Sequence, residues 1–388
     1  MSKKNDTSLD NKKNISKKVK SNKDDKSIKK EEKIKVPKTK IQKLKLKHKK
    51  LILVIIVLLI VFISMFFIKT KNEEIKENKK EESKIEEKKE EKKISIIDIN
   101  SKTRPFAVMI NNIDVARTVQ SGLQDAFIIY EIIVEGGITR YLALFQDTNT
   151  ERIGSIRSAR HYYLDYALEN DAIYVHHGYS PQAANDFYSL GVDRIEVSTP
   201  STGWRDKTLN VSSEHTLFTS IELLKNGLGN KRVERKKDFL LNYKADEINL
   251  EKIKDSLVAN KVIIPYSNAN TTSYTYNKKD KMYYRYVNNK EHTDYVTKEQ
   301  YKFKNIITYQ VKNYTLNDSE NKGRQGIENI GSGEGYYITN GYAIKINWKK
   351  ECRDCQTKYT YLDGKELNVN DGNTFIQIQP TNKSLTIE

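Results

Sequence analysis

Arginine, serine and histidine side chains that could hold an anion gather in residues 152–161 (RIGSIRSARH). We expect this stretch to lead from a strand into a helix over residues 158–168. If Ser158 caps that helix, free backbone N–H groups lie beside Arg157 and Arg160, an arrangement that suits a phosphate or a carboxylate. The alternative is that these arginines pair with acidic residues of their own domain, such as Glu131, Glu135 or Asp165.

Two neighbouring histidines, His176 and His177, end a strand-like run and precede Ser180-Pro181, which is typical of the start of a helix. In layered α/β structures, sites tend to form at the carboxyl ends of strands, so one of the two histidines is a candidate ligand contact. Adjacent strand residues point to opposite faces, which argues against a shared metal ion. The other histidine is expected to have a structural role.

A third polar cluster combines residues 203–206 (GWRD) with residues 214–216 (EHT). Trp204 and Arg205 could form the rim of a sugar or peptide groove; alternatively, Trp204 and a local ion pair fix a loop. We expect these clusters to form one anion site. The direct contacts are Arg157, Arg160 and His161, the assisting residues are Arg140, Glu135 and His176, and the rim is formed by Trp204 and Arg205.

Familiar catalytic motifs are absent from the sequence. Ser155, Ser158 or Ser180 could join His176 or His215 in a hydrolase triad, but no G-x-S-x-G motif is present. A Walker loop, a G-x-G-x-x-G motif after a strand and H-E-x-x-H are absent as well. We therefore assign no catalytic residue and no cofactor.

Cys352 and Cys355 are the only cysteines. A single C-x-x-C cannot supply a four-thiolate zinc site, and between two strand-like runs it lacks the helix N-terminus that activates redox thiols. Outside the membrane the pair is a candidate for a local disulfide across a β-turn, whose small loop would add little stability.

An uncharged apolar run begins at Leu51 and ends at Ile68, with Ser64 as its only polar residue. As a helix it is about 27 Å long, close to the hydrocarbon thickness of a bilayer, so we expect a transmembrane anchor in the lipid bilayer. Residues 1–50 hold 20 Lys against 6 Asp and Glu, and lysine on one flank of a span marks the cytoplasmic side. A single-pass protein is expected, with a cytoplasmic N-terminus and extracytoplasmic domains. A cleaved signal peptide is the rival interpretation, but the run exceeds the usual length of about 7–15 residues.

Two charged segments flank this run. Residues 1–50 contain no aromatic side chain to stack on bases, so we expect a disordered basic cytoplasmic tail and no nucleic-acid partner. Residues 69–93 are almost entirely Lys and Glu, with too few apolar residues for a coiled coil, and are expected to form a solvated stalk. Residues 94–388 hold 38 basic and 36 acidic residues, so most of the net charge of +17 belongs to the tail.

The composition becomes globular at residue 94, and two domains are expected, at residues 94–245 and 246–388. The first alternates strand-like and helix-like runs, which predicts a mixed α/β domain with strands at residues 106–111, 126–134, 138–146, 172–176 and 195–197 and a further helix at 181–190. The pattern of residues 246–388 predicts a smaller, mostly antiparallel β domain, with strands at residues 261–265, 272–276, 282–286, 342–348, 359–361 and 374–379. The glycine run at residues 331–335 is expected to be a turn. The fold class is α+β behind a single transmembrane helix.

Several of these stretches resemble the YerB-like extracytoplasmic proteins of Gram-positive bacteria. The likeness to their N-terminal domain lies in residues 104–112 (RPFAVMINN), 120–123 (QSGL), 126–145, 153–160 (IGSIRSAR), 171–182, 204–206 and 215–220. The likeness to their C-terminal domain lies in residues 331–350, 357–359, 363–365 and 375–380. The resemblance implies a cell-envelope location, a link to wall metabolism and two domains of uncharacterised function, without catalytic residues to carry over. Members of that family are typically lipoproteins, whereas this chain has no lipobox cysteine, so its apolar helix must be the anchor.

We therefore expect a membrane-anchored envelope protein that binds or regulates, with an anionic cell-wall component or an envelope enzyme as its partner. The alternative is an enzyme acting on wall polymers, either a hydrolase or a phosphoryl or glycosyl-phosphate transferase that grips a diphosphate with its arginines.

Overall fold

The computed structural model describes residues 38–86 and 92–388. They belong to two units, one ending at Glu90 and one formed by Glu91–Glu388, which are described separately. Residues 1–37 of the expected tail and residues 87–91 of the expected stalk lie outside the described part of the chain.

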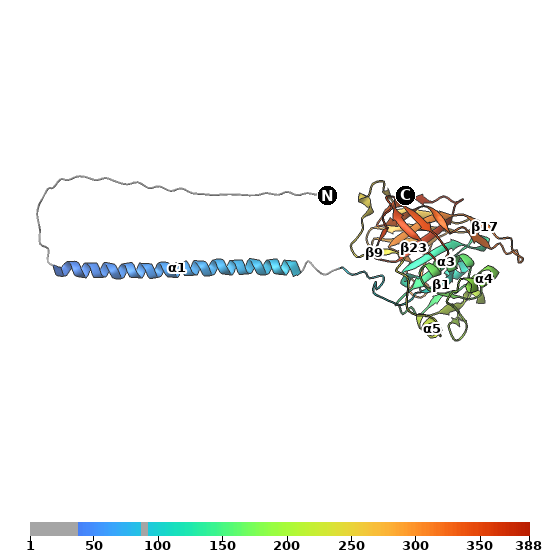
Figure 1. Ribbon diagram of the computed structural model, residues 1–388, viewed down its shortest axis with the longest axis horizontal. Helices are drawn as coiled ribbons and strands as arrows, with labels where there is room; N and C mark the ends of the chain where they lie inside the picture. Colours follow the sequence, from blue (N-terminus) through green and yellow to red (C-terminus); the bar gives the residue numbers. More distant parts are fainter. Residues whose placement is uncertain (1–37, 87–91) are drawn as a thin grey trace, which may run out of the picture. The chain divides into compact units, whose positions relative to one another are not determined.

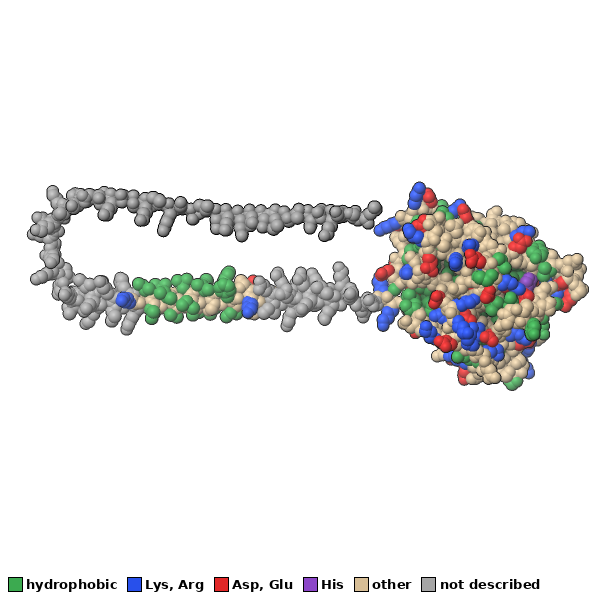
Figure 2. Space-filling view, in the orientation of Figure 1, with side chains coloured by type: hydrophobic (Ala, Val, Ile, Leu, Met, Phe, Trp, Pro, Cys, Tyr) green, Lys and Arg blue, Asp and Glu red, His purple; other side chains and the backbone are tan. Residues whose placement is uncertain are grey.

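The first unit contains one helix, α1 (Lys38–Glu86). Its segment Leu51–Glu73 is long and apolar enough to cross a membrane, and none of its apolar stretch, the green band in Figure 2, is buried against protein. Apolar side chains without a protein partner need a nonpolar solvent, so the segment fits a membrane anchor. Because the helix also includes residues 38–50, the prediction of disorder is wrong there; lysine and leucine are good helix formers.

The second unit is built on an eleven-stranded mixed sheet in the order β10-β20-β19-β16-β23-β2-β3-β1-β5-β6, with β21 beside β20. Its strands are β1 (Phe106–Asn111), β2 (Ile128–Ile133), β3 (Thr139–Phe145), β5 (Ile173–His176), β6 (Arg194–Glu196), β10 (Leu257–Val258), β16 (Asn305–Val311), β19 (Gly331–Thr339), β20 (Tyr342–Lys350), β21 (Lys358–Tyr361) and β23 (Thr374–Pro380). The parallel pair β2–β23 joins early and late parts of the chain, whose cyan and orange ribbons lie side by side in Figure 1. The division expected after residue 245 therefore falls inside one compact unit.

A second sheet covers one face of the first. Its order is β14-β13-β12-β11-β24, with β15 beside β13. The strands are β11 (Lys261–Pro265), β12 (Thr271–Asn277), β13 (Met282–Val287), β14 (Lys290–Glu291), β15 (Lys302–Phe303) and β24 (Thr386–Ile387). Val262 and Ile264 of β11 pack in one buried cluster with Val108 and Ile129 of the main sheet.

Two helices, α3 (His161–Glu169) and α4 (Pro181–Ser189), cover the opposite face, where Tyr163 and Phe187 pack with Met109 and Tyr130. The unit thus has three layers: helices, main sheet and second sheet. Shorter elements complete it: α2 (Asp114–Arg117), α5 (Ile221–Asn226), β4 (Ile153–Gly154), β7 (Trp204–Arg205), β8 (Leu217–Thr219), β9 (Asn242–Lys244), β17 (Asn313–Thr315), β18 (Gln325–Ile327), β22 (Asn368–Asn370) and four 3₁₀ turns in the described residues.

The α+β class is confirmed, and β1 has the predicted bounds. Helix α4 begins at Pro181 as predicted, because the Ser180 hydroxyl accepts a hydrogen bond from the N–H of Ala183. The glycine run expected to be a turn is instead the start of β19. Helix α3 begins three residues later than predicted: Arg160, and not Ser158, is at the N-cap, and its side chain makes no capping bond.

The two sheets meet at a fully buried ion pair. Glu131 of β2 and Arg285 of β13 are both inaccessible to solvent, with Oε2 and Nη2 2.8 Å apart. The Glu131 carboxylate also accepts hydrogen bonds from the hydroxyls of Thr139 (2.7 Å) and Thr272 (3.1 Å), and from the amide of Asn112 (3.1 Å). Such a complete set of donors offsets the cost of removing the charges from water.

Arg285 continues this network. Its Nη1 donates to Nδ1 of His292 (2.6 Å), and Nε2 of His292 bonds to the side-chain oxygen of Gln120. The Gln120 amide in turn donates to the backbone carbonyl of Asn111 at the end of β1. Burial, and next the charge of Arg285, hold the pKa of His292 well below its usual range, so the ring is neutral.

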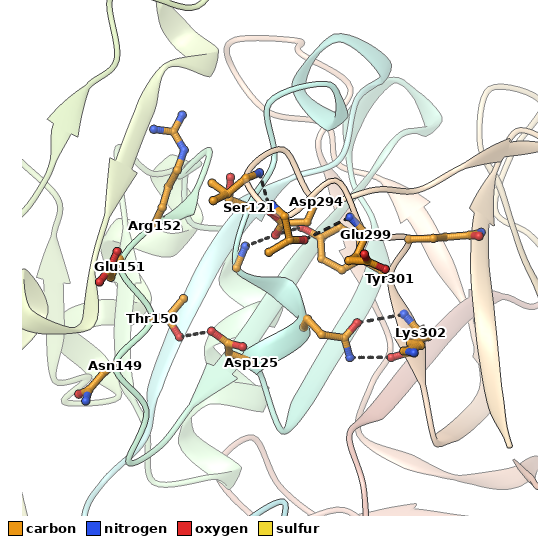
Figure 3. A pocket seen from close by; sticks show the side chains of 15 residues that line it. Ser121, Asp125, Asn149, Thr150, Glu151, Arg152, Asp294, Glu299, Tyr301 and Lys302 are labelled. Atoms are coloured by element: carbon orange, nitrogen blue, oxygen red, sulfur yellow. Dashed lines mark hydrogen bonds between the residues drawn. The ribbon is translucent and has the colours of Figure 1, made fainter. Parts of the chain in front are cut away.

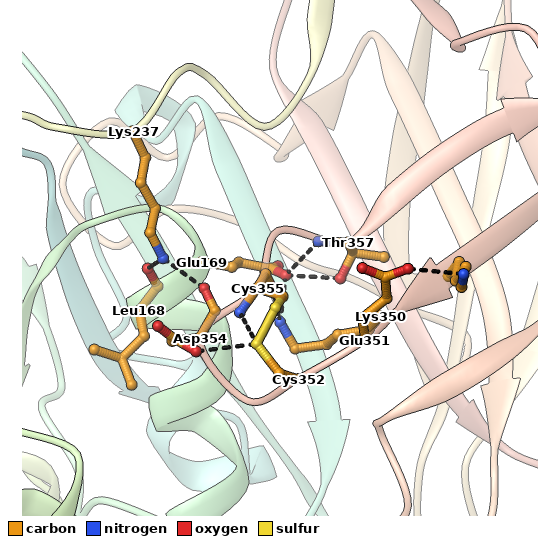
Figure 4. Close-up of a disulfide and its surroundings, with 10 residues drawn as sticks. Leu168, Glu169, Lys237, Lys350, Glu351, Cys352, Asp354, Cys355 and Thr357 are labelled. Atoms are coloured by element: carbon orange, nitrogen blue, oxygen red, sulfur yellow. Dashed lines mark hydrogen bonds and ion pairs between the residues drawn. A yellow bond between two sulfur atoms is a disulfide. The ribbon is translucent and has the colours of Figure 1, made fainter.

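A disulfide joins Cys352 and Cys355 in the connection between β20 and β21 (Figure 4). This connection lies against the end of α3: Lys350 Nζ is 2.8 Å from the buried Glu169 carboxylate and 2.5 Å from the Cys355 carbonyl. The hydroxyl and N–H of Thr357 also donate to Glu169 (2.7 and 3.0 Å). The disulfide therefore constrains the loop that satisfies a buried carboxylate.

We expect Arg285→Met to lower the free energy of unfolding of the Glu91–Glu388 unit by about 3–5 kcal/mol, because it leaves Glu131 charged and buried. Urea titration of the isolated unit measures this loss. The double variant Glu131→Gln, Arg285→Met should recover part of it. The matched control Lys312→Met, which breaks the exposed pair with Glu328, should cost no more than about 1 kcal/mol. An Arg285→Met loss equal to the control would contradict this account.

Leu58→Arg together with Leu59→Arg should release the full-length protein from membranes. Each charge near the centre of a span costs about 2.5–3.5 kcal/mol of insertion free energy, and both residues lie within Leu51–Glu73. Fractionation after alkaline carbonate washing checks this, with Ser64→Leu as a control that should stay in the membrane pellet. Retention of the double arginine variant in the pellet would locate the anchor elsewhere.

Candidate functional site

An inserted segment, residues 155–159, lies between the carboxyl ends of β1 and β5. The N–H of Asn111 donates to the carbonyl of Ser155 (3.0 Å), and the N–H of His177 donates to the carbonyl of Arg157 (3.1 Å). Backbone N–H groups at the carboxyl ends of both strands thus donate hydrogen bonds to the same segment. This arrangement brings the first two predicted polar clusters together.

Charged side chains gather around this insertion, and we call them the arginine surface. Five arginines stand against three carboxylates, with two histidines between them. The members are Arg140, Arg157, Arg160, Arg194, Arg205, Glu135, Glu196, Glu214, His176 and His177.

Two of the arginines are tied to Glu135. Arg160 donates from Nε to Oε2 of Glu135 (3.0 Å) and from Nη2 to Oε1. Arg140 donates to the carbonyl of Ser158 (2.6 Å), and its Nη2 is 3.9 Å from Glu135. Burial, and next the charge of Arg157, lower the pKa of Arg140 to about 10. Pairing within the domain, the alternative that the sequence left open, is therefore present for both residues.

Arg157 is more accessible than Arg140 and Arg160, though less accessible than Arg194. Its Nη2 is 2.8 Å from Glu214, and the side chains of Arg157 and Glu214 are 21% and 55% exposed. Nε of Arg157 has no hydrogen-bond partner in the described structure; the same holds for Nε of Arg140, the hydroxyl of Ser155 and Oδ1 of Asn111. Ion pairs this exposed contribute little, so an anionic ligand can compete with Glu214 for Arg157.

The two histidines face different neighbours. His176 is buried, donates from Nδ1 to the carbonyl of Gly178 (2.9 Å) and stacks on Phe187 of α4. Its Nε2 accepts from Arg194 (3.3 Å), while Nε2 of His177 accepts from Arg205 (3.3 Å). Burial lowers the pKa of His176 to about 4, so it is neutral at pH 7. Each histidine therefore positions one arginine.

His161 and Trp204 are the two predicted site residues that make no hydrogen bond to the arginine surface among the described residues. His161 is the first residue of α3, and its backbone carbonyl accepts a hydrogen bond from Nη2 of Arg353 (3.2 Å). Trp204 packs on Phe218 with ring centres 6.2 Å apart. Sequence reasoning missed Glu214 as the partner of Arg157, because residues 57 positions apart carry no local signal.

Within residues 92–388, no serine hydroxyl is hydrogen bonded to a histidine. The Ser180 hydroxyl caps α4, and the Ser155 hydroxyl has no partner. Among the described residues, one group of ligand-type side chains is close enough to hold a metal, namely Cys352, Asp354 and Cys355, and its sulfur atoms are joined in the disulfide.

A cavity of about 740 Å³ lies between residues 121–152 of the N-terminal stretch and residues 294–302 of the C-terminal stretch (Figure 3). Its wall is fixed by Asp294, whose carboxylate accepts from the N–H of Gly122 (2.7 Å) and the hydroxyl of Tyr301 (2.8 Å). Gly122 has a φ of 88°, and a Cβ there would lie 2.5 Å from the Arg152 carbonyl, so the wall requires glycine. Gly122 belongs to the stretch at residues 120–123 (QSGL), which is the feature of the sequence that could have indicated this wall.

The lining of this cavity is acidic. It includes Asp125, Glu151, Asp294 and Glu299 against two basic residues, Arg152 and Lys302, and Lys302 is paired with Asp280 at 3.2 Å. The Arg152 side chain points away in Figure 3 and pairs with Asp206 at 2.9 Å. Since carboxylates repel a negatively charged ligand, this cavity is unfavourable for an anion.

Comparisons with known proteins agree with this architecture. Two family models match: "Protein of unknown function (DUF3048) N-terminal domain" over residues 95–234 and the corresponding C-terminal domain over residues 262–376. "Putative lipoprotein YerB" of Bacillus subtilis (strain 168) is 31% identical over 289 residues, which are 72% of this chain and 82% of that protein. The crystal structure of the YerB protein from Bacillus subtilis is similar with a TM-score of 0.63 at 29% identity, covering 74% of this chain and 94% of that chain.

The depressed pKa of His176 predicts a pH dependence. Its folded-state value of about 4 lies below the usual 6.5, so the unfolded chain binds more protons between these values, and stability falls as pH drops through this window. We expect the stability difference between wild type and His176→Gln to shift by about 3 kcal/mol from pH 7 to pH 4. Urea titrations of both proteins across this range measure the shift. Parallel pH profiles would contradict this account, because they would mean that folding leaves the pKa of His176 unchanged.

Proposed function

Because the chain belongs to the DUF3048 family and carries an apolar helix near its N-terminus, we propose that it is a single-pass envelope protein whose arginine surface binds an anionic cell-wall component. In this proposal the lysine-rich residues 1–50 are cytoplasmic and the Glu91–Glu388 unit is extracytoplasmic, in a Gram-positive envelope. The observation that carries the proposal is Arg157, an accessible guanidinium whose partner Glu214 is itself more than half exposed.

The chemistry of the arginine surface supports an anionic ligand over a neutral one. Guanidinium groups bind phosphate or carboxylate oxygens in pairs of charge-assisted hydrogen bonds. Arg194 and Arg205 contact ring nitrogens of His176 and His177, and among the described residues Arg194 has one carboxylate within 4 Å, that of Glu196 at 3.4 Å. The buried pairs of Arg160 and Arg140 with Glu135 keep the floor rigid.

Binding, and not turnover, is the role that this geometry supports. A hydrolase needs a nucleophile activated by a base, and the serines at this surface have no such hydrogen bond among the described residues. An envelope enzyme that presents acidic side chains is the alternative occupant of the same surface, as the sequence analysis anticipated.

The test is a sedimentation assay of the Glu91–Glu388 unit with purified Gram-positive cell wall, before and after removal of teichoic acid. We expect wild type to bind intact wall and to lose binding to stripped wall. Arg157→Ala together with Arg194→Ala should weaken binding at least about tenfold, since a charge-assisted hydrogen bond contributes about 1.5–3 kcal/mol.

Two variants make the test specific to this surface. Glu214→Gln frees Arg157 from its competitor and should strengthen binding. Lys312→Ala removes an exposed charge from a different pair and should leave binding unchanged. Equal binding by wild type and the double arginine variant would overturn the ligand site and direct the search toward an envelope enzyme.

A further inference from the structure

The outer part of β19 and β20 carries a polar face that no other layer covers. Ile338 and Ala343, which pair across these strands, pack in the core beneath the second sheet. Side chains two and four residues away on the same face, Tyr336 and Glu334, are half-buried and exposed, respectively. The main sheet therefore extends beyond the second sheet and leaves part of its face open.

Two hollows lie on this open face and share Glu334. One, of about 410 Å³, is lined by residues of β19, β20 and β21: Ser332, Glu334, Asn347, Lys349, Lys358 and Thr360, among others. The other, of about 580 Å³, extends over β16 and the chain end, with Gln310, Tyr336, Lys345, Gln379 and Lys383 in its lining. The two hollows are adjacent on either side of Glu334, and together we call them the polar groove.

The strand register orders the floor of the polar groove. Asn347 pairs with Glu334 on one side and with Thr360 on the other, and Gln310 pairs with Gln379. These residues form a row of amide, carboxylate and hydroxyl groups across five adjacent strands. At about 4.8 Å between strands, the row is about 19 Å long, the scale of several linked sugar or polyol units.

Three side chains that line the groove can still form hydrogen bonds. Within the described structure, the side chains of Tyr336, Asn347 and Thr360 make no hydrogen bond to protein, although all three are partly buried. An amide and hydroxyls offer both donors and acceptors, which match the hydroxyl groups of a polyol. The Tyr336 ring adds an apolar face against which the C–H side of a sugar ring can pack.

Lysines stand at both ends of the groove. Lys358 lines the first hollow and Lys383 the second, and neither lies within 4 Å of a carboxylate in the described part of the chain. The one carboxylate of the row, Glu334, is already paired with Lys345 at 3.2 Å. The groove therefore has a positive surplus, which selects a ligand with negative charges along its length.

We propose that the polar groove binds an extended anionic glycan strand, at a site separate from the arginine surface. Asn347 and Thr360 bind sugar hydroxyls, Tyr336 packs on a ring, and Lys358 and Lys383 pair with anionic groups at the two ends. The groove gives the protein a second contact with a polymer, so it can hold a chain along its length and not only at one charged group.

Calorimetric titration of the Glu91–Glu388 unit with oligogalacturonate tests the proposal, because its methyl ester is a neutral polymer with the same backbone. We expect oligogalacturonate to bind and the ester to bind at least tenfold more weakly. Lys358→Ala with Lys383→Ala should weaken oligogalacturonate binding at least tenfold, and Asn347→Ala with Thr360→Val should weaken both probes. These residues are on an open face, so their substitution leaves the core intact.

The controls separate this site from the one proposed above. In a protein that already carries Arg157→Ala, oligogalacturonate should still bind, and Lys358→Ala with Lys383→Ala should still weaken that binding at least tenfold. Lys312→Ala should leave wall binding and oligogalacturonate binding unchanged. Absence of oligogalacturonate binding by wild type, equal affinity for the ester, or an unaffected Lys358→Ala, Lys383→Ala variant would each overturn the proposal. Loss of oligogalacturonate binding with Arg157→Ala would also overturn it, because the glycan would then occupy the arginine surface.

Discussion

The buried ion pair between Glu131 and Arg285 is the constraint on which the rest of the unit depends. The two residues are 154 positions apart and belong to different sheets, yet neither is accessible to solvent. A charge in such a place is costly unless it is paired and hydrogen bonded. Here Thr139, Thr272 and Asn112 donate to the Glu131 carboxylate, while Nε of Arg285 has no partner in the described structure. The N-terminal and C-terminal family domains therefore stabilise each other, because neither contains both charges.

The same pair is connected to the arginine surface. Hydrogen bonds run from Arg285 through His292 and Gln120 to the carbonyl of Asn111, whose side-chain amide donates to Nδ1 of His215 at 3.0 Å. Nε2 of His215 then faces Glu214 at 3.5 Å, and Glu214 holds Arg157. A partly exposed arginine is thus connected, through the exposed Glu214, to polar groups that are buried in the core.

Local patterns predicted local structure well, and long-range pairing was beyond their reach. The apolar run of β1 and the Ser180-Pro181 start of α4 depend on neighbouring residues alone. The glycine-rich part of β19 was misjudged because glycine is uncommon in strands; here a Cβ at Gly335 would lie 2.4 Å from the Thr308 carbonyl, so a crowded strand requires glycine. The types of residue at the arginine surface were predictable, but Glu214 and the parallel pairing of β2 with β23 were not, since no periodicity relates such distant segments.

Charge distribution, and not total charge, determines what this unit can bind. Residues 94–388 hold 38 basic and 36 acidic residues, so the unit has almost no net charge with which to attract a polyanion from a distance. Selectivity must then come from contacts at short range, where the arginine surface and the polar groove are positive and the cavity beside Asp294 is acidic. In the proposed location a cell wall would surround the protein with ligand at high concentration. Weak contacts at the two proposed sites would then together hold one polymer chain, because binding at the first raises the effective concentration at the second.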